Sequence, residues 1–472
     1  MAVGACLSGF AWIAARAREP YALSDWDLAT MADRGSTARG MTILREGGAE
    51  MQRAGFRVVG FDCAEEEHVA VLLDEKGEVE QRFKVVNRRD RIQECLARLI
   101  LTLGEDATPV IVVESKRAHG RLVVEEAGRL GCEVIQVNTV ALNHFRDVEG
   151  QPRKDDERDA YLAARMAYLR LRGCRELVEV TDEERALCRL TRSYARLTDD
   201  RTQQVVRLRA VLLEVAPEIL HRSWEGPKPS SRAMMYLLDR WPGFEGLERA
   251  QLRSIEKILH QCRYGERAAP VARVLREMAR RISLEAGERM AITLEINALV
   301  RQIAACDASL EKLSDEITRR VEGHPVGVKL LEMHGIGPVI AGVLVSELLP
   351  VARTATEAQS ATYAGVTPLG RKSGKSLDTS QLTQGVNKRI LHALYTSSVV
   401  AIKNSAIDRA YYNKKFREYA GHPKPHVAAF IALSRQRHKV VYKLMTTGAR
   451  YDTEILICRH LDRIEEARKS VA

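Results

Sequence analysis

The sequence contains no pair of cysteines at the CxxC spacing and no apolar run approaching the roughly 20 residues of a membrane helix. Paired cysteines at short spacing are typical of structural zinc sites, so we expect no zinc domain. The nine cysteines are scattered, most of them in apolar stretches. This pattern is typical of small core residues in a protein of the reducing cytoplasm. We therefore expect a cytoplasmic protein with no membrane partner.

Positive charge is in excess: 73 Lys and Arg stand against 63 Asp and Glu, a formal net charge of +10. A basic balance favours a polyanionic partner, and nucleic acid is the partner that remains once the membrane is set aside. The 472 residues are too many for one hydrophobic core, so two or three domains are expected.

Residues 1–50 lack sustained periodicity and a basic n-region, so we expect a disordered extension rather than a signal peptide. The pattern of the rest predicts four further parts. These are an α/β domain at 51–175, a helical coiled-coil region at 176–322 with an insertion at 224–270, a mostly helical domain at 323–450, and a tail at 451–472.

The α/β domain begins with three β-rich runs at 56–62, 68–74 and 78–86, separated by short charged turns. A helix is predicted at 90–103. Short apolar runs typical of buried strands follow at 109–114 and 132–137, with a helix at 117–130 between them. Three antiparallel strands followed by alternating helices and strands are the order of the ribonuclease H-like (RuvC-like) fold.

The stretch RKDDERDAYLAARM (153–166) crowds Asp155, Asp156, Glu157 and Asp159 at the start of a predicted helix that runs to about 171. Like charges this close repel each other. The crowding becomes favourable if divalent cations lie between carboxylates that converge from separate segments. Asp62 ends the first strand and Glu114 the fourth, while Asp156 and Asp159 share a helix face, so we expect the four to meet at one sheet edge.

Each acid also has a purely structural interpretation. Asp62 is compatible with a turn at a strand end, and Asp155 or Asp156 with a helix N-cap. Asp155 points away from the 156/159 face, so we assign it to capping or to solvent. An unpaired carboxylate after an apolar strand is costly, which favours a functional role for Glu114.

The stretch HGIGPVIAG (334–342) predicts helix, turn, helix, similar to a helix-hairpin-helix motif. The backbone N–H groups of such a turn, here at Gly335 and Gly337, bind a DNA phosphate. A tight turn used only for packing explains the same residues equally well.

Residues 371–443 hold fifteen Lys and Arg against three Asp and Glu, a net charge of 15 − 3 = +12. This excess favours phosphate binding over a solvated surface. The candidates for it are Arg371, Lys372, Lys375, Lys388 and Arg389. Ser373 lies among the first three, where cations would assist a serine nucleophile; a hydroxyl that only contacts phosphate is the alternative.

Taken together, Asp62, Glu114, KDDERDA and HGIGP…YAGVTP…SG…GVNKRILHALY resemble the DEDD insertion-sequence transposases, a family described as bridge-RNA-guided serine recombinases. The resemblance runs from about 56 to 447. It implies a tetrad of Asp62, Glu114, Asp156 and Asp159 that binds Mg²⁺ (or Mn²⁺), and Ser373 as the nucleophile. It also implies donor and target double-stranded DNA, a noncoding guide RNA, and a homo-oligomer (dimer or tetramer) that acts at the nucleoid.

Two other functions remain open. One is a metal-dependent Holliday-junction-type nuclease in which water replaces the serine. The other is an inactive nucleic-acid-binding protein. The chain departs from the family pattern in CAEEE (63–67) after the first aspartate, in its N-terminal extension and in the loops at 224–270.

Overall fold

The computed structural model describes residues 56–104, 108–115, 118–149, 155–171, 173–177, 180–367, 369–373, 377–381 and 386–451. The extension predicted at 1–50, and all of the predicted tail except Tyr451, lie outside these residues. The chain forms two compact units. One comprises Arg185–Val328 with Gly337–Gly342, and the other the α/β part up to Glu184, Lys329–Ile336 and the part from Val343 onward.

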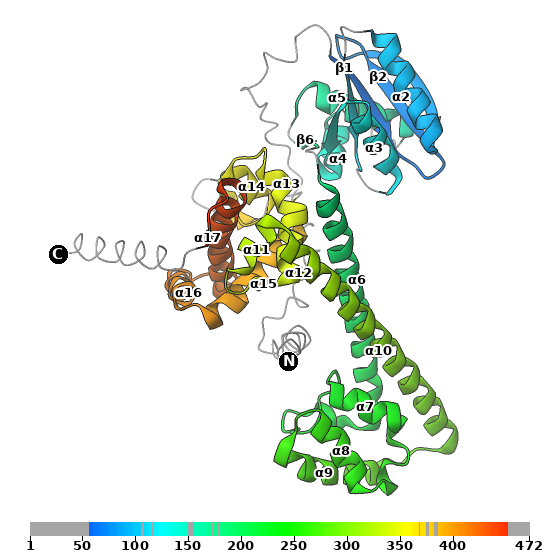
Figure 1. Cartoon of the computed structure of the whole chain (residues 1–472), viewed down its shortest axis with the longest axis vertical. Helices are drawn as coiled ribbons and strands as arrows, with labels where there is room; N and C mark the ends of the chain where they lie inside the picture. The colour runs from blue at the N-terminus through cyan, green and yellow to red at the C-terminus, as the bar shows by residue number, and fades with distance from the viewer. Residues whose placement is uncertain are drawn as a thin grey trace, which may run out of the picture. The chain divides into compact units, whose positions relative to one another are not determined.

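A six-stranded mixed sheet organises the α/β part (Figure 1). Its order is β3-β2-β1-β4-β5-β6. Strands β1, β2 and β3 form antiparallel pairs, β4 and β5 run parallel to β1, and β6 is antiparallel to β5. The bounds are Phe56–Asp62 for β1, Glu67–Leu73 for β2, Val79–Val86 for β3, Thr108–Val113 for β4, Glu133–Val137 for β5 and Cys174–Glu176 for β6.

Helices cover both faces of this sheet. Helices α2 (Arg89–Leu103) and α3 (Arg121–Arg129) share a core with Phe61 and Val113. Helices α4 (Thr139–Val148) and α5 (Asp156–Tyr168) share the opposite core with Val58 and Val112. The alternation along each strand therefore sends neighbouring side chains into different cores. The predicted strands and flanking helices are confirmed, whereas α4 and β6 are additional elements.

Gly60 explains how closely α5 approaches the sheet. A Cβ atom at this position would lie 2.1 Å from the carbonyl oxygen of Ala160 and 2.9 Å from the Ala164 Cβ. Only a glycine leaves room for this contact between helix backbone and strand. The N-terminal turns of α5 are thereby held over the end of β1.

Two long helices, α6 (Asp182–Val215) and α10 (Ala286–Gly323), dominate the first unit. Arg201 of α6 pairs with Asp307 of α10. Helices α7 (Arg232–Arg240), α8 (Leu252–Gln261) and α9 (Ala268–Arg281) lie between them in sequence and share one apolar core with both (Figure 1). The segment 224–270 thus contains helices α7 and α8 within this core. A coiled coil stays a prediction.

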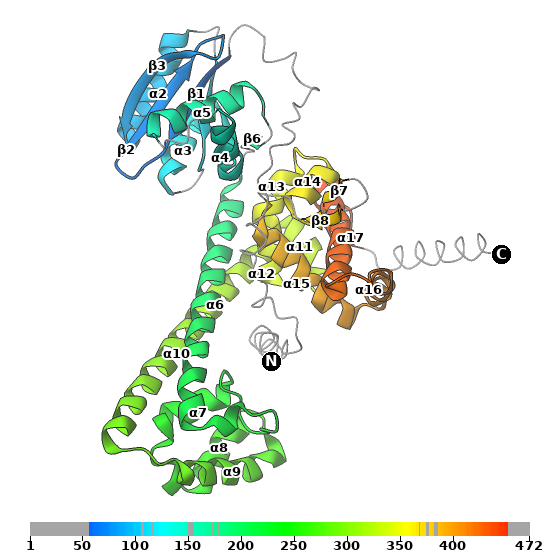
Figure 2. The ribbon, with the colours of Figure 1, turned by 180° about the vertical axis from the view of Figure 1, so that it is seen from behind.

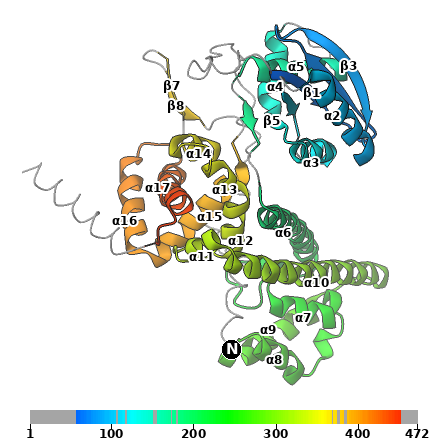
Figure 3. The same cartoon turned by 45° about the horizontal axis from the view of Figure 1, so that its top comes forward.

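The remaining C-terminal part is mostly helical, as predicted (Figure 2). A two-stranded hairpin, β7 (Leu369–Ser373) with β8 (Leu377–Gln381), interrupts the helices and projects beyond α14 (Figure 3). No helix in the described ranges has the length and apolarity needed to cross a bilayer. The helices are α11 (Pro325–Leu331), α12 (Pro338–Val343), the π-helical turn η7 (Leu344–Leu348), α13 (Leu349–Ala352), α14 (Glu357–Tyr363), α15 (Lys388–Asn404), α16 (Ala406–Glu418) and α17 (Pro425–Thr447).

Candidate functional site

Asp62 and Glu114 follow equivalent positions on two neighbouring parallel strands. Phe61 of β1 pairs in register with Val113 of β4. Asp62 is the residue after Phe61, and Glu114 is the residue after Val113. Adjacent strands lie about 4.8 Å apart. The fold therefore brings these two predicted site residues side by side at the carboxyl end of the sheet.

On both strands every second side chain faces α5, and each acid continues that series. Val58 and Gly60 of β1 face α5, and Asp62 is the next residue of that series. Val110 and Val112 of β4 belong to the same core, and Glu114 follows them. Because side chains alternate along a strand, both carboxylates are directed to the side on which α5 begins.

The first turn of α5 carries the other two predicted acids. The helix begins at Asp156, which is exposed, whereas Asp159 is buried. Asp159 Oδ1 accepts hydrogen bonds from Arg146 Nη2 at 2.6 Å and from Arg146 Nε at 3.1 Å. Asp155 occupies the N-cap position without a side-chain capping bond, so of its two expected roles the solvated one fits.

Carboxylates are the ligands that a hard divalent cation prefers. The side chains as they stand do not enclose one. Across the described ranges, no group of three or more His, Cys, Asp and Glu side chains is arranged to hold a metal ion. Arg146 instead supplies the positive charge next to Asp159. Arg146 occupies only Oδ1 of Asp159, so a cation bound by this carboxylate would have to use Oδ2 or displace the guanidinium.

The pKa of the Cys63 thiol reflects the negative charge at this edge of the sheet. Burial, together with the charges of Asp62 and Glu114, raises the pKa of the Cys63 thiol to about 12. The thiol consequently stays protonated and does not compete as a nucleophile.

Ser373 is the last residue of β7, and its backbone pairs with Leu377 of β8. Arg371 and Lys372 precede it on the same strand. Lys375 lies outside the described residues. The serine is therefore carried near the tip of a projecting hairpin that the sequence pattern did not predict.

The two glycines of the predicted helix-hairpin-helix have different environments. Gly335 has φ +81, and a Cβ there would lie 2.4 Å from the Ser397 carbonyl oxygen, so its lack of a side chain serves packing against α15. Gly337 is exposed, with no atom within 4 Å of a Cβ built there. A turn joins α11 to α12 as the sequence predicted, and Gly337 is exposed on it; binding of a DNA phosphate there stays a prediction.

Ion pairs engage part of the basic segment 371–443. Arg389 donates to buried Glu347, Arg435 and Arg437 pair with Glu357 and Asp408, and Lys415 pairs with Glu418. Lys388, by contrast, is exposed. Further exposed cations of this segment are Lys403, Arg409, Lys414, Arg417, Lys424, Lys439 and Lys443. Contact of Arg389 with nucleic acid stays a prediction, because its Nε is committed to Glu347.

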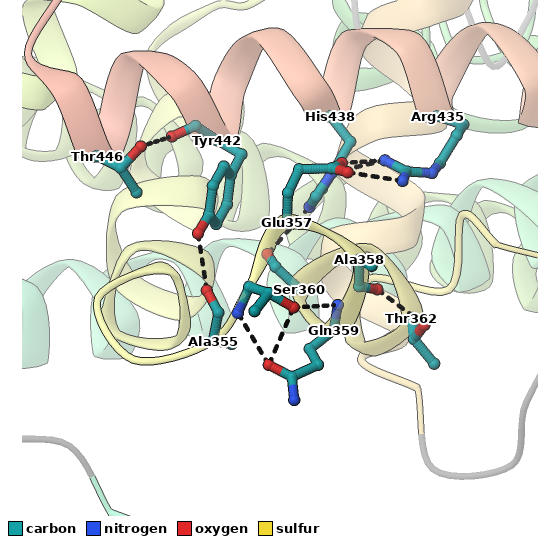
Figure 4. A network of polar contacts seen from close by, with 11 residues as sticks. Ala355, Glu357, Ala358, Gln359, Ser360, Thr362, Arg435, His438, Tyr442 and Thr446 are labelled. Carbon is teal, nitrogen blue, oxygen red and sulfur yellow. Dashed lines mark hydrogen bonds and ion pairs between the residues drawn. The ribbon is translucent and has the colours of Figure 1, made fainter.

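Figure 4 shows the hydrogen-bonding partners of another serine, Ser360 of α14. Its Oγ lies 3.1 Å from His438 Nε2, and His438 Nδ1 lies 3.2 Å from Glu357 Oε1. Since a carboxylate only accepts, Nδ1 donates to Glu357 and Nε2 accepts the Ser360 proton. Ser360 and His438 are both completely buried, so this serine–histidine–glutamate arrangement joins α14 to α17 and is closed to substrate.

Two family models match the chain. Residues 59–217 match a model described as "Transposase", and residues 328–413 match one described as "Transposase IS116/IS110/IS902 family". The first match covers nearly all of the α/β part and the whole of α6, and the second runs from α11 into α16 and includes the serine hairpin.

Relatives of similar length span most of the chain. A 43.6 kDa protein of insertion element IS110 from Streptomyces coelicolor is 24% identical over 84% of this chain and 96% of its own length. A 42 kDa protein of insertion element IS900 from Mycobacterium paratuberculosis is 23% identical over 83% of this chain and 96% of its own. Both are proteins of insertion elements, the class of mobile DNA to which the two family models also point. The chain belongs to the IS110 family of insertion-element transposases.

Proposed function

We propose that this transposase exchanges DNA strands through a covalent phosphoserine intermediate at Ser373, assisted by a divalent cation, Mg²⁺ or Mn²⁺, at Asp62, Glu114, Asp156 and Asp159. The α/β part is then a ribonuclease H-like (RuvC-like) domain. The observation that carries most weight is the equal register of Asp62 and Glu114 on the sheet side where α5 begins. Membership of the transposase family supports DNA as the substrate.

The serine step is a phosphoryl transfer. Ser373 Oγ forms a bond to the scissile phosphorus, and the bond from phosphorus to one deoxyribose oxygen breaks. The hydroxyl proton is released, and the displaced oxygen takes up a proton. Attack by a second strand's hydroxyl reverses the step and joins the new strands. A bound divalent cation would stabilise charge on the phosphate oxygens.

The chain's own residues have separate tasks in this scheme. The backbone of β7 and β8 presents the serine, and the exposed cations of α15–α17 offer contacts to DNA phosphates. Following the family resemblance, we propose that a noncoding RNA selects donor and target. We also propose that the protein acts as a dimer or tetramer in which the serine of one protomer meets the tetrad of another.

Trapping the protein on labelled DNA tests the proposal. After protease digestion, the DNA-bound peptide should contain Ser373, and Ser373→Ala should abolish both adduct and exchange. Ser376→Ala is the matched control and should keep most activity. Cleavage by Ser373→Ala without any adduct would instead favour the metal-dependent nuclease, whereas binding without cleavage by the native chain would favour the inactive binding protein.

A further inference from the structure

Glu347 is a buried carboxylate for which the proposed mechanism has no use. It lies in the π-helical turn η7, a type of local geometry that recurs at functional sites. Its side chain is 4% exposed. A carboxylate this deeply buried is costly unless every oxygen is paired. Its Oε2 accepts from Asn387 Nδ2 at 2.7 Å, and its Oε1 accepts from Arg389 Nε at 2.9 Å.

Asn387 uses all its polar groups. Besides Glu347, its Nδ2 donates to the Tyr363 hydroxyl at 3.1 Å. Its Oδ1 accepts from the backbone N–H groups of Arg389 and Ile390 and so caps α15. Its own backbone N–H donates to the Tyr363 carbonyl oxygen at 2.8 Å. One side chain therefore connects the buried acid, the start of α15 and the end of α14.

Tyr363 and Asn387 flank the segment 364–386, which contains the serine hairpin. The two ends of this segment also touch each other. A Cβ on Gly365, which has φ +74, would lie 3.2 Å from the Val386 Cβ. The two ends of the hairpin segment therefore meet at one point of the helical body. Asn387 lies at this point and donates hydrogen bonds to Glu347 and to the Tyr363 carbonyl oxygen.

We propose that Glu347 is a positioning residue that fixes the base of the Ser373 hairpin through Asn387 and Arg389. This inference rests on the proposed function of Ser373. A tilt of the base of a hairpin is passed on to the residues that its strands carry, here to Ser373. Displacements of about 1 Å at a reacting group can cost about 10²-fold in rate. Glu347 therefore acts on the orientation of the serine and touches neither the serine nor DNA.

The test compares Glu347→Gln with Glu357→Gln. Glutamine at 347 preserves shape and one acceptor, but it loses the charge that faces Arg389. We expect the rate of adduct formation to fall roughly ten- to a hundredfold, without a loss of DNA affinity. Amide hydrogen exchange at Asn387 should accelerate as the base opens. Glu357 pairs with Arg435 at the opposite end of α14 from Tyr363, so Glu357→Gln should lower thermal stability without changing the adduct rate of the folded protein.

Three results separate the possibilities. Adduct formation and Asn387 exchange at native rates in Glu347→Gln would overturn the inference. Equal losses of thermal stability, DNA affinity and adduct rate in both variants would also overturn it, since Glu347 would then be a general structural residue. If the native chain forms no adduct, the proposed serine mechanism fails, and exchange at Asn387 still decides whether Glu347 holds the base.

Discussion

Arg146 and Asp159 form a buried ion pair at the edge where the tetrad is proposed to bind metal, with two guanidinium nitrogens on one carboxylate oxygen. The arginine belongs to α4, a helix on the same sheet face as α5. It provides a counter-charge that keeps a buried aspartate tolerable. A divalent cation at this carboxylate would therefore be repelled by the positive charge of the guanidinium.

Replacing Arg146 should change metal binding and stability in opposite directions. Arg146→Gln removes this positive charge, so Mn²⁺ should bind more tightly in calorimetric titration at low salt. The folded state should lose about 3 kcal/mol, because Asp159 is left without its partner. Arg82→Gln is the control, since Arg82 faces exposed Glu157 at 3.5 Å. Unchanged Mn²⁺ affinity in Arg146→Gln would remove Asp159 from the proposed ligands.

Mixing two inactive variants tests whether active sites are shared between protomers. Ser373→Ala lacks the nucleophile, and Glu114→Gln lacks a proposed metal ligand. If serine and tetrad come from different protomers, some mixed assemblies contain one site with both intact halves. Strand exchange should then reappear in the mixture at a fraction of the native level. Activity that stays absent, although the mixed oligomer forms, would place serine and tetrad in the same chain.

The two glycines of the 334–338 turn should respond differently to alanine. Gly335→Ala forces a side chain into a left-handed conformation and against the Ser397 carbonyl oxygen, so it should cost at least about 1–3 kcal/mol of folding stability. Gly337→Ala should fold normally, since nothing occupies the space. Denaturant unfolding measures both. If Gly337 approaches a phosphate, its alanine variant should also bind DNA more weakly by filter assay; equal stability of the two variants would contradict the packing role of Gly335.

Acid should destabilise the packing of α14 on α17. Burial lowers the pKa of His438 from 6.5 to about 4. The imidazole is therefore neutral in the folded state, and it takes up a proton more readily when the chain is unfolded. This contribution is complete above pH 6.5 and is lost as the pH falls toward 4, by about 3 kcal/mol in total.

Urea unfolding between pH 7 and pH 4 measures this effect. His438→Gln removes the titrating group and should flatten the curve between pH 6.5 and about 4.5. A lowered pKa of Glu357, caused first by its hydrogen bond from Arg435, adds a further loss at lower pH. Parallel curves for the native chain and His438→Gln would show that another group governs acid stability.

Much of the α/β part was predictable because its strands are apolar and sharply bounded. Apolar runs such as PVIVV predicted the strands and their order along the chain. The acids at the ends of these runs predicted that Asp62 and Glu114 lie at the same edge of the sheet. Helix α4 was missed because TVALNHFRDV mixes β-branched and polar residues, and its start is set by the Asn138 cap. The three residues of β6 are too few for any periodicity to be visible.

The partners of the charged residues were the least predictable part of the site. Arg146 and Asp159 are thirteen positions apart, and Glu347 and Arg389 are forty-two apart, so only the fold pairs them. The serine hairpin was missed because LGRKSGKSLDTSQ is polar and lacks the alternation of a half-buried strand. Net charge located the basic segment, but it did not reveal which cations already have acidic partners.

The apolar core shared by α7, α8 and α9 has a consequence for the order of folding. Its buried members come only from residues 208–303. Contacts that close over so short a stretch form quickly and need nothing synthesised later. This bundle should therefore fold on the ribosome before α14–α17 have emerged. The first turns of α10, up to Ile303, belong to this core, and from them the helix can elongate along α6 toward Asp307 and its partner Arg201.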